Sequence, residues 1–143
     1  KYLNEQIISI LKQKNVKTKI FISVDNSTDG SEELVRSICE TYNNIICLDT
    51  GKKFGSAQKN FYHIIKEVDF SQFDYVCLSD QDDIWFNDHL KRAINCIQLN
   101  KCSGYSASVI SFWSNKKKIY IPSKWKVTFK ASENINKKLN EKI

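Results

Sequence analysis

Acidic side chains follow two apolar runs of the 143-residue chain, in patterns that could bind a cation. Asp80, Asp82 and Asp83 come directly after YVCLS, and Asp25 comes directly after KIFISV. Neighbouring carboxylates repel one another, and removing them from water is costly unless a cation compensates. Mg²⁺ and Mn²⁺ prefer such hard oxygen ligands, commonly one or two carboxylates together with substrate phosphates. The later cluster therefore predicts a divalent-cation site that also receives a diphosphate.

Both clusters also have a purely structural interpretation. Asp82 or Asp83 could cap the following helix while Asp80 remains in water. The run Asp-Asn-Ser-Thr-Asp-Gly that begins at Asp25 is ordinary turn chemistry, and a capping loop needs nothing more. The catalytic interpretation depends on the two clusters occurring together at one edge of a sheet.

The elements that must position these clusters follow from hydrophobic periodicity. Helical spacing of apolar residues predicts helices over residues 2–14, 31–42, 56–66 and 87–99, and short β-branched runs predict buried strands over residues 19–24, 45–49 and 75–79. The alternation predicts an α/β fold, layered α/β/α, with a mostly parallel sheet. Ligands of such sheets collect beyond the carboxyl ends of the strands, where both acidic clusters fall. Residues 105–113 and 118–121 flank a polar turn and predict a hairpin.

Four segments resemble, in order and spacing, the nucleotide-sugar domain of family 2 glycosyltransferases of the GT-A, Rossmann-like fold. They are KYLNEQIISILKQ, ISVDNSTDGSEELV, GKKFGSAQKNF and YVCLSDQDDIW, and the resemblance covers residues 1 to about 121. It is especially clear for bacterial enzymes that build surface polysaccharides. The resemblance implies that a sugar passes from a nucleotide donor, most commonly a UDP-sugar, to a hydroxyl of a glycan or lipid-linked acceptor. It also implies inversion at the anomeric carbon and assistance by Mn²⁺ or Mg²⁺.

The resemblance assigns roles to individual residues. Asp25 matches the aspartate that hydrogen-bonds the nucleotide base. Lys59 stands where the family commonly has an arginine near the nucleotide, although it could be a plain surface lysine. Asp82 matches the direct metal ligand of a D-x-D pair, and Asp80 lies nearer the ribose or a metal-bound water. Gly55 would permit a tight turn before the third helix.

Two parts of the family pattern are not found in the sequence. Relatives begin with an apolar strand, central in the sheet, before the segment that matches Lys1. Their general base comes from a later acidic motif, whereas Glu133 and Glu141 stand in no recognisable setting, so the catalytic base is unknown. We therefore expect a partial nucleotide-sugar-binding domain over residues 1–121, without its first strand and acceptor region, and of low stability in isolation.

A lysine-rich extension over residues 122–143 is predicted to follow this domain. The chain has 22 basic and 16 acidic side chains, a net charge of +6, and residues 114–143 contribute nine lysines against Glu133 and Glu141. This charge could hold the protein at anionic lipid on the inner, cytoplasmic face of a membrane, or it could be a solvated tail. No nucleic-acid partner is predicted. No apolar run approaches the ~18 residues of a membrane span.

Five cysteines occur, at positions 39, 47, 77, 96 and 102, without the C-x-x-C spacing of zinc sites or redox motifs. Four of them, Cys39, Cys47, Cys77 and Cys96, fall inside apolar segments. The pattern predicts reduced thiols that act as small core residues.

Two other function classes remain open. A Mg²⁺-dependent phosphohydrolase of the haloacid-dehalogenase type also places a D-x-D after a strand. That class has the motif on its first strand with Thr or Val soon after it, whereas Asp83-Ile84-Trp85 follows here and at least two predicted strands precede. A noncatalytic module that binds nucleotide sugars would keep the fold without the base.

Overall fold

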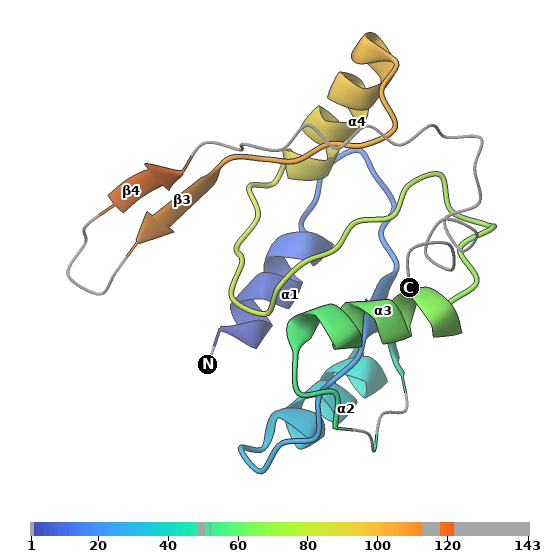
Figure 1. Cartoon of the computed structure of the whole chain (residues 1–143), viewed down its shortest axis with the longest axis vertical. Helices are drawn as coiled ribbons and strands as arrows, with labels where there is room; N and C mark the ends of the chain where they lie inside the picture. The colour runs from blue at the N-terminus through green and yellow to red at the C-terminus, as the bar shows by residue number, and fades with distance from the viewer. Residues whose placement is uncertain (1, 49–50, 52, 113–117, 122–143) are drawn as a thin grey trace. The chain divides into compact units, whose positions relative to one another are not determined.

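A computed structural model describes residues 2–48, 51, 53–112 and 118–121. In chain order the elements are α1 (Leu3–Leu11), β1 (Ile20–Ile22), α2 (Ser31–Thr41), β2 (Ile45–Cys47), α3 (Ala57–Glu67), α4 (His89–Asn100), β3 (Val109–Phe112) and β4 (Lys118–Ile121) (Figure 1). The four helices confirm the four predicted ones, each a few residues shifted or shortened at its ends. The described residues divide into two compact units. One contains residues up to Leu11 with Lys17–Trp85, and the other contains Lys12–Val16 with residues from Phe86 onward.

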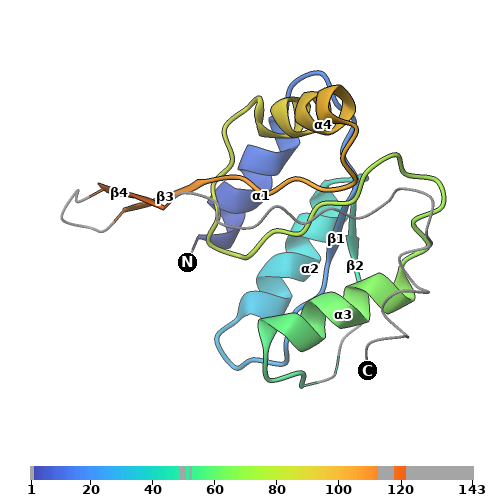
Figure 2. The same cartoon turned by 45° about the horizontal axis from the view of Figure 1, so that its top comes forward.

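The first unit contains a two-stranded parallel sheet. β1 pairs with β2 in a register that sets Ile20 opposite Ile45 and Ile22 opposite Cys47. Figure 2 shows the two strands side by side, and α2 is the helical crossover between them. Parallel strands cannot be joined by a tight hairpin, so a crossover of this kind is what their pairing requires. The predicted α/β fold class is confirmed, as an incomplete α/β domain.

The core of the first unit lies where α1, α2 and β2 meet. Ile7, Ile38 and Ile45 form one buried cluster, each less than a tenth exposed. On α1 the buried residues include Ile7 and Ile10, and on α2 they are Val35 and Ile38. Each pair is three residues apart, which places both side chains on one helix face. Amphipathic periodicity thus correctly predicts that these four residues turn inward, whereas Leu34 of α2 and Tyr42 after it, which the same periodicity places inside, are exposed.

The predicted strand over residues 75–79 is wrong, because these residues form no strand in the structure. Tyr75, Val76 and Leu78 are 39%, 40% and 52% exposed. A strand exists through hydrogen bonds to a neighbouring strand, and within the described part of the first unit β1 and β2 pair with each other alone. The composition of residues 75–79 is therefore typical of a strand, but no described β-ladder includes this segment.

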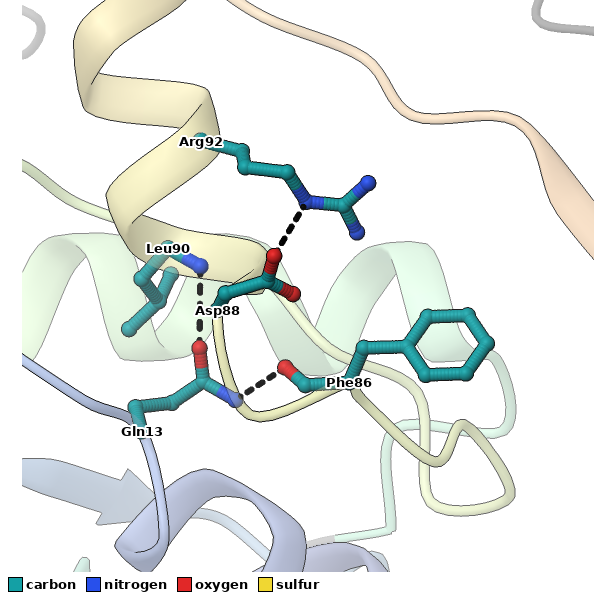
Figure 3. Close-up of polar contacts among 5 residues, drawn as sticks. All are labelled: Gln13, Phe86, Asp88, Leu90 and Arg92. Carbon is teal, nitrogen blue, oxygen red and sulfur yellow. Dashed lines mark hydrogen bonds and ion pairs between the residues drawn. The ribbon is translucent and has the colours of Figure 1, made fainter.

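In the second unit, the side chain of Gln13 holds the start of α4 (Figure 3). Its Nε2 donates to the carbonyl of Phe86 at 2.7 Å, and its Oε1 accepts from the backbone N–H of Leu90 at 2.9 Å. The first N–H groups of a helix have no partner within the helix. Gln13, which is 8% exposed, satisfies one of them from outside the helix. Asp88 and Arg92 form an exposed ion pair on the first turn, with 3.2 Å between Oδ2 and Nε.

The predicted hairpin is confirmed in the second unit. β3 pairs with β4 in antiparallel fashion, with Val109 opposite Ile121 and Phe112 opposite Lys118. The predicted lysine-rich extension over residues 122–143 lies outside the described residues, as do Glu133 and Glu141. Among the helices that the structure describes, none has the length and apolar character to cross a membrane.

Candidate functional site

Asp25 lies just beyond the carboxyl end of β1 and binds a loop from elsewhere in the chain. Its Oδ1 accepts from the backbone N–H of Phe54, and its Oδ2 accepts from the backbone N–H of Gly55, both at 2.7 Å. Gly55 has φ of 71°, in the left-handed region that glycine adopts without steric cost. The turn predicted at Gly55 is therefore present, and two consecutive amides of that turn hold one carboxylate.

Asp29, later in the same loop, has a structural role. Oδ1 of Asp29 accepts from the hydroxyl of Ser27 at 2.6 Å and from the backbone N–H of Ser31 at 3.1 Å. These hydrogen bonds, that from Ser27 most of all, lower the pKa of the Asp29 carboxyl to about 2. The carboxylate thereby satisfies the first N–H of α2. The capping interpretation holds for Asp29, whereas Asp25 bonds to the distant loop at Phe54.

Lys59 lies in the first turn of α3. Ser56 caps this helix, because its hydroxyl accepts from the backbone N–H of Lys59 at 3.3 Å. The Lys59 residue is exposed. Its neighbour Asn60 donates from Nδ2 to the carbonyl of Ser23 at 2.9 Å. Asn60 thus ties α3 to the end of β1, and it positions the turn that carries Lys59.

Asp80 and Asp82 lie in the loop that follows residues 75–79, and both are exposed. Nε2 of Gln6 donates to the carbonyl of Asp80 and to the hydroxyl of Ser79, the latter at 2.8 Å. The N–H of Asp83 also donates to the Asp80 carbonyl, at 3.4 Å. The backbone of the D-x-D segment is therefore fixed from α1, while the carboxylates of Asp80 and Asp82 face solvent.

A second residue of α1 holds the same loop further along. The hydroxyl of Ser9 accepts from the backbone N–H of Trp85 at 3.0 Å. Ser9 is 7% exposed and Gln6 is 6% exposed, so both are buried polar residues on the inward face of a helix. Buried polar groups need partners, and here the partners include backbone groups of the acidic loop.

One structural alternative for the acidic cluster is wrong. The helix that follows the cluster is α4, which begins at His89 with Asp88 as the preceding residue. Asp82 and Asp83 are therefore too early in the chain to cap it. The side chains of Asp80 and Asp82 are exposed in this loop.

Over residues 1–143 the chain matches the protein family described as Glycosyl transferase family 2. It belongs to that family. It is similar to the dTDP-rhamnosyl transferase RfbG of Shigella flexneri, with 44% identity over 118 residues, or 82% of this chain and 41% of RfbG. It is also similar to an uncharacterized glycosyltransferase of Haemophilus influenzae, with 29% identity over 99 residues, or 69% of this chain and 38% of that protein. The chain thus spans about two fifths of the length of these relatives.

The donor set of this family 2 chain fits a cation that is shared with a ligand. Within the described ranges, no three His, Cys, Asp or Glu side chains come together as a metal-binding group. Mg²⁺ does not require such a group, because it usually keeps waters and takes one or two carboxylates plus substrate phosphates. Asp80 and Asp82 are exposed carboxylates two residues apart, which is the kind of donor that such an ion uses.

The structure brings the predicted residues of the family 2 site into two groups. Asp25 is joined through the loop at Gly55 to the start of α3, which carries Lys59. Asp80 is joined to α1 through Gln6. Sequence reasoning missed Asn60 and Gln6. Asn60 stands beside Lys59 in the GKKFGSAQKNF segment, and Gln6 is a polar residue directly before Ile7 on the apolar stripe of α1.

Proposed function

We propose that this chain is the donor-binding part of a glycosyltransferase of polysaccharide biosynthesis. It would transfer a sugar from a nucleoside diphosphate to an acceptor hydroxyl with inversion. The observation that carries the proposal is the Asp25 carboxylate, held at the carboxyl edge of the sheet by the amides of Phe54 and Gly55, in a chain of glycosyltransferase family 2. Parallel sheets place their ligands at this edge.

Asp25 keeps capacity to recognise a base while it holds the loop. An ionised carboxylate has about four lone-pair sites on its two oxygens. The amides of Phe54 and Gly55 use one site on each oxygen. The remaining sites can accept the N3–H of a pyrimidine base, and the two amide bonds orient the carboxylate for that purpose. Asp25 is therefore proposed as a base-recognition residue whose position is set before the nucleotide binds.

The donor nucleotide is proposed to be a pyrimidine diphosphate sugar. Uracil and thymine both present an N3–H, so a carboxylate at Asp25 would accept from either. RfbG of Shigella flexneri is named a dTDP-rhamnosyl transferase. dTDP-rhamnose is therefore proposed as a donor for this chain alongside UDP-sugars. The affinities of the chain for dTDP and for UDP distinguish the two.

Lys59 and the D-x-D pair are proposed to receive the phosphates and the ribose. Lys59 lies in the first turn of α3, so its cation and the N-terminus of that helix would both attract the diphosphate. Asp82 would hold a Mn²⁺ or Mg²⁺ ion directly, with Asp80 nearer the ribose or a metal-bound water. Such an ion supplies Lewis-acid stabilisation of the charge that develops on the diphosphate leaving group. Gln6 binds the backbone carbonyl of Asp80 and so holds the loop that carries both carboxylates.

The acceptor is proposed to be a glycan or a lipid-linked sugar at the cytoplasmic face of a membrane. The nine lysines of residues 114–143 would attract anionic lipid at that face, and the attraction falls as salt increases. Cosedimentation with vesicles that contain anionic lipid, at low and moderate salt, tests this part. If the chain failed to sediment with the vesicles at both salt concentrations, the membrane contact would be excluded.

Calorimetry with dTDP, UDP and a purine nucleoside diphosphate tests the donor proposal. We expect the pyrimidine diphosphates to bind and Asp25→Asn to weaken them at least about tenfold, since one charge-assisted hydrogen bond contributes about 1.5–3 kcal/mol. Asp69→Asn is the matched control, because Asp69 is an exposed aspartate that bonds Ser71 in a local turn. Equal affinity for all three nucleotides, unchanged in Asp25→Asn, would contradict the proposal. Release of the nucleoside diphosphate from a sugar donor would separate a transferase from a module that only binds.

A further inference from the structure

Two cysteines of the first unit, Cys39 and Cys47, belong to elements that pack on one another. The expectation that the cysteines are core residues is wrong for Cys47 and Cys77, which are exposed, whereas Cys39 packs against the core. Cys47 is exposed on β2 and Cys39 is half-buried on α2, and both are free thiols. Cys39 packs against the cluster that contains Ile38 and Ile45. The half-buried thiol of α2 therefore faces the strand that carries the exposed one.

Strand geometry places Cys47 on the same face of β2 as this cluster. Side chains two residues apart on a strand point to the same face of the sheet. Ile45 and Cys47 are two apart, and Ile45 is buried against Ile38 of α2. The face of β2 that bears Cys47 is thus the face that α2 covers.

Helix geometry then sets Cys39 at the level of Cys47. The N–H of Ile45 donates to the carbonyl of Tyr42 at 3.0 Å. These two residues therefore lie at the same height along the strand, where the chain turns from α2 into β2. From Ile45 to Cys47 the strand advances about 6.6 Å, and about four helical residues cover that distance at 1.5 Å each. About four residues back from Tyr42 along α2 lies the helical turn that contains Cys39. Cys39 is therefore at about the height of Cys47.

The packing of α2 on β2 thus brings the two thiols near one another. In agreement with this, partial burial and the Cys39 thiol raise the pKa of the Cys47 thiol to about 12, while Arg36 opposes the rise. Within the described part of the chain, no third Cys, His, Asp or Glu joins them in a metal-binding group, so the pair favours disulfide over metal chemistry.

We propose that Cys39 and Cys47 are a modification site, a dithiol that a small-molecule disulfide such as oxidised glutathione converts reversibly to an intramolecular disulfide. One cysteine thiolate attacks a glutathione sulfur, forming a mixed disulfide and releasing one reduced glutathione. The other cysteine, as its thiolate, attacks the protein sulfur of that mixed disulfide, forms the Cys39–Cys47 bond and releases the second glutathione. Both protons leave with the two glutathione thiols, and the protein loses two electrons. The raised pKa of Cys47 makes the exchange slow at neutral pH and faster as pH rises.

The bond would fix the carboxyl end of β2 to α2. Cys47 is opposite Ile22, and the next residue, Leu48, donates its N–H to the Ile22 carbonyl at 2.8 Å. The chain continues from there to the Phe54 and Gly55 amides that hold Asp25. The proposed disulfide therefore lies at the strand end from which that loop departs, and it does not depend on the identity of the donor.

The test equilibrates the full chain with mixtures of reduced and oxidised glutathione, blocks free thiols with an alkylating reagent, and maps peptides by mass spectrometry. Trypsin cuts after Arg36 and Lys52, so one peptide contains both cysteines. Cleavage after Glu40 by a glutamate-specific protease then leaves two halves that stay joined when the disulfide is present. We expect joined halves as the main oxidised product of this region.

Three comparisons separate a pair that the fold creates from simple nearness in the sequence. Oxidation in urea at the same glutathione ratio should lower the linked fraction at least about tenfold, because unfolding removes the enforced proximity. Cys39→Ser should abolish the link and leave Cys47 as a mixed disulfide with glutathione, whereas the matched control Cys77→Ser should retain the link. Mixed disulfides at both positions without a link in the native chain, or an equal linked fraction in urea, would overturn the proposal.

Discussion

The Asp25 carboxylate lies 2.7 Å from the backbone N–H of Gly55, and the same carboxylate lies 2.7 Å from the N–H of Phe54. This relationship joins the end of β1 to the turn before α3, across 30 residues of sequence. Hydrogen bonds from backbone amides to a carboxylate are stronger than those between neutral groups. Asp25 therefore has a structural effect that can be measured apart from any ligand.

Substitution of Asp25 by Asn should destabilise the unliganded chain by about 1–2 kcal/mol. The new amide can offer one oxygen to one of the two N–H groups, and its NH₂ group faces the other donor. Urea unfolding measures the change. Asp69→Asn, which alters an exposed aspartate bonded to Ser71 in a local turn, should cost less than Asp25→Asn. Equal stability of the parent and Asp25→Asn would mean that the two amide bonds contribute nothing.

Substitutions of the neighbours Lys59 and Asn60 should affect different properties, ligand binding for Lys59 and stability for Asn60. Asn60→Ala removes the hydrogen bond to the Ser23 carbonyl and should cost about 1 kcal/mol in urea unfolding. Lys59→Ala should leave stability within about 0.5 kcal/mol, because the side chain is exposed, and should weaken binding of nucleoside diphosphates. Calorimetry measures the second effect. If Lys59→Ala bound diphosphate as the parent does, the proposed role of Lys59 would be lost.

Asp82→Asn should remove the metal dependence of nucleotide binding. An amide oxygen is a neutral and weaker ligand for Mg²⁺ or Mn²⁺ than a carboxylate. We expect Mn²⁺ to increase the affinity of the parent chain for a nucleoside diphosphate, and to have little effect on Asp82→Asn. Calorimetry with and without Mn²⁺ measures both. Asp69→Asn again serves as the control, and a metal effect that survives Asp82→Asn would remove Asp82 from the site.

The Asp29 carboxyl should titrate well below the ordinary pKa of an aspartate. Its pKa is lowered to about 2 from 3.8 by hydrogen bonds from Ser27 and Ser31. A lowered folded-state pKa means that the contribution to stability is complete above the unfolded value and is lost as pH falls through about 2. NMR titration of the side chain measures the value directly. Ser27→Ala should move the pKa up toward 3.8, and an unchanged titration would assign the shift to another cause.

Gln13→Ala should loosen the start of α4 in the second unit. The substitution leaves the Leu90 N–H without its side-chain acceptor, at a cost of about 1–2 kcal/mol. Amide hydrogen exchange at Leu90 should become faster, which measures the effect locally. Arg92→Ala is the matched control, because its ion pair with Asp88 is exposed and contributes about 0–1 kcal/mol. Similar exchange in Gln13→Ala and the parent would contradict the capping role.

Local pattern predicted the elements that need only local information. The helix faces of α1 and α2 and the parallel pairing of β1 with β2 follow from apolar periodicity and from the strand-helix-strand order. The strand expected at residues 75–79 failed because a strand also needs a neighbour, and composition does not supply one. The prediction that Cys47 and Cys77 are core residues failed for a related reason. An apolar segment need not be buried, and both residues are exposed.

The same distinction between local and long-range information applies to the residues of the candidate site. Asp25 and Gly55 could be singled out from turn chemistry and the family resemblance, but their hydrogen bond could not, because it joins segments 30 residues apart. Asn60 was missed because an amide in the first turn of a helix is unremarkable in sequence until the Ser23 carbonyl is seen beside it. The roles of Asp80, Asp82 and Lys59 toward a nucleotide remain predictions.

The buried amide of Gln6 has a consequence for anyone who redesigns α1. A helix repacked entirely with hydrocarbon side chains would keep its amphipathic pattern and still cover the sheet. It would also release the Asp80 carbonyl, 74 positions away in the chain, from the group that holds it. The geometry of an acidic loop would then drift although no acidic residue had been touched.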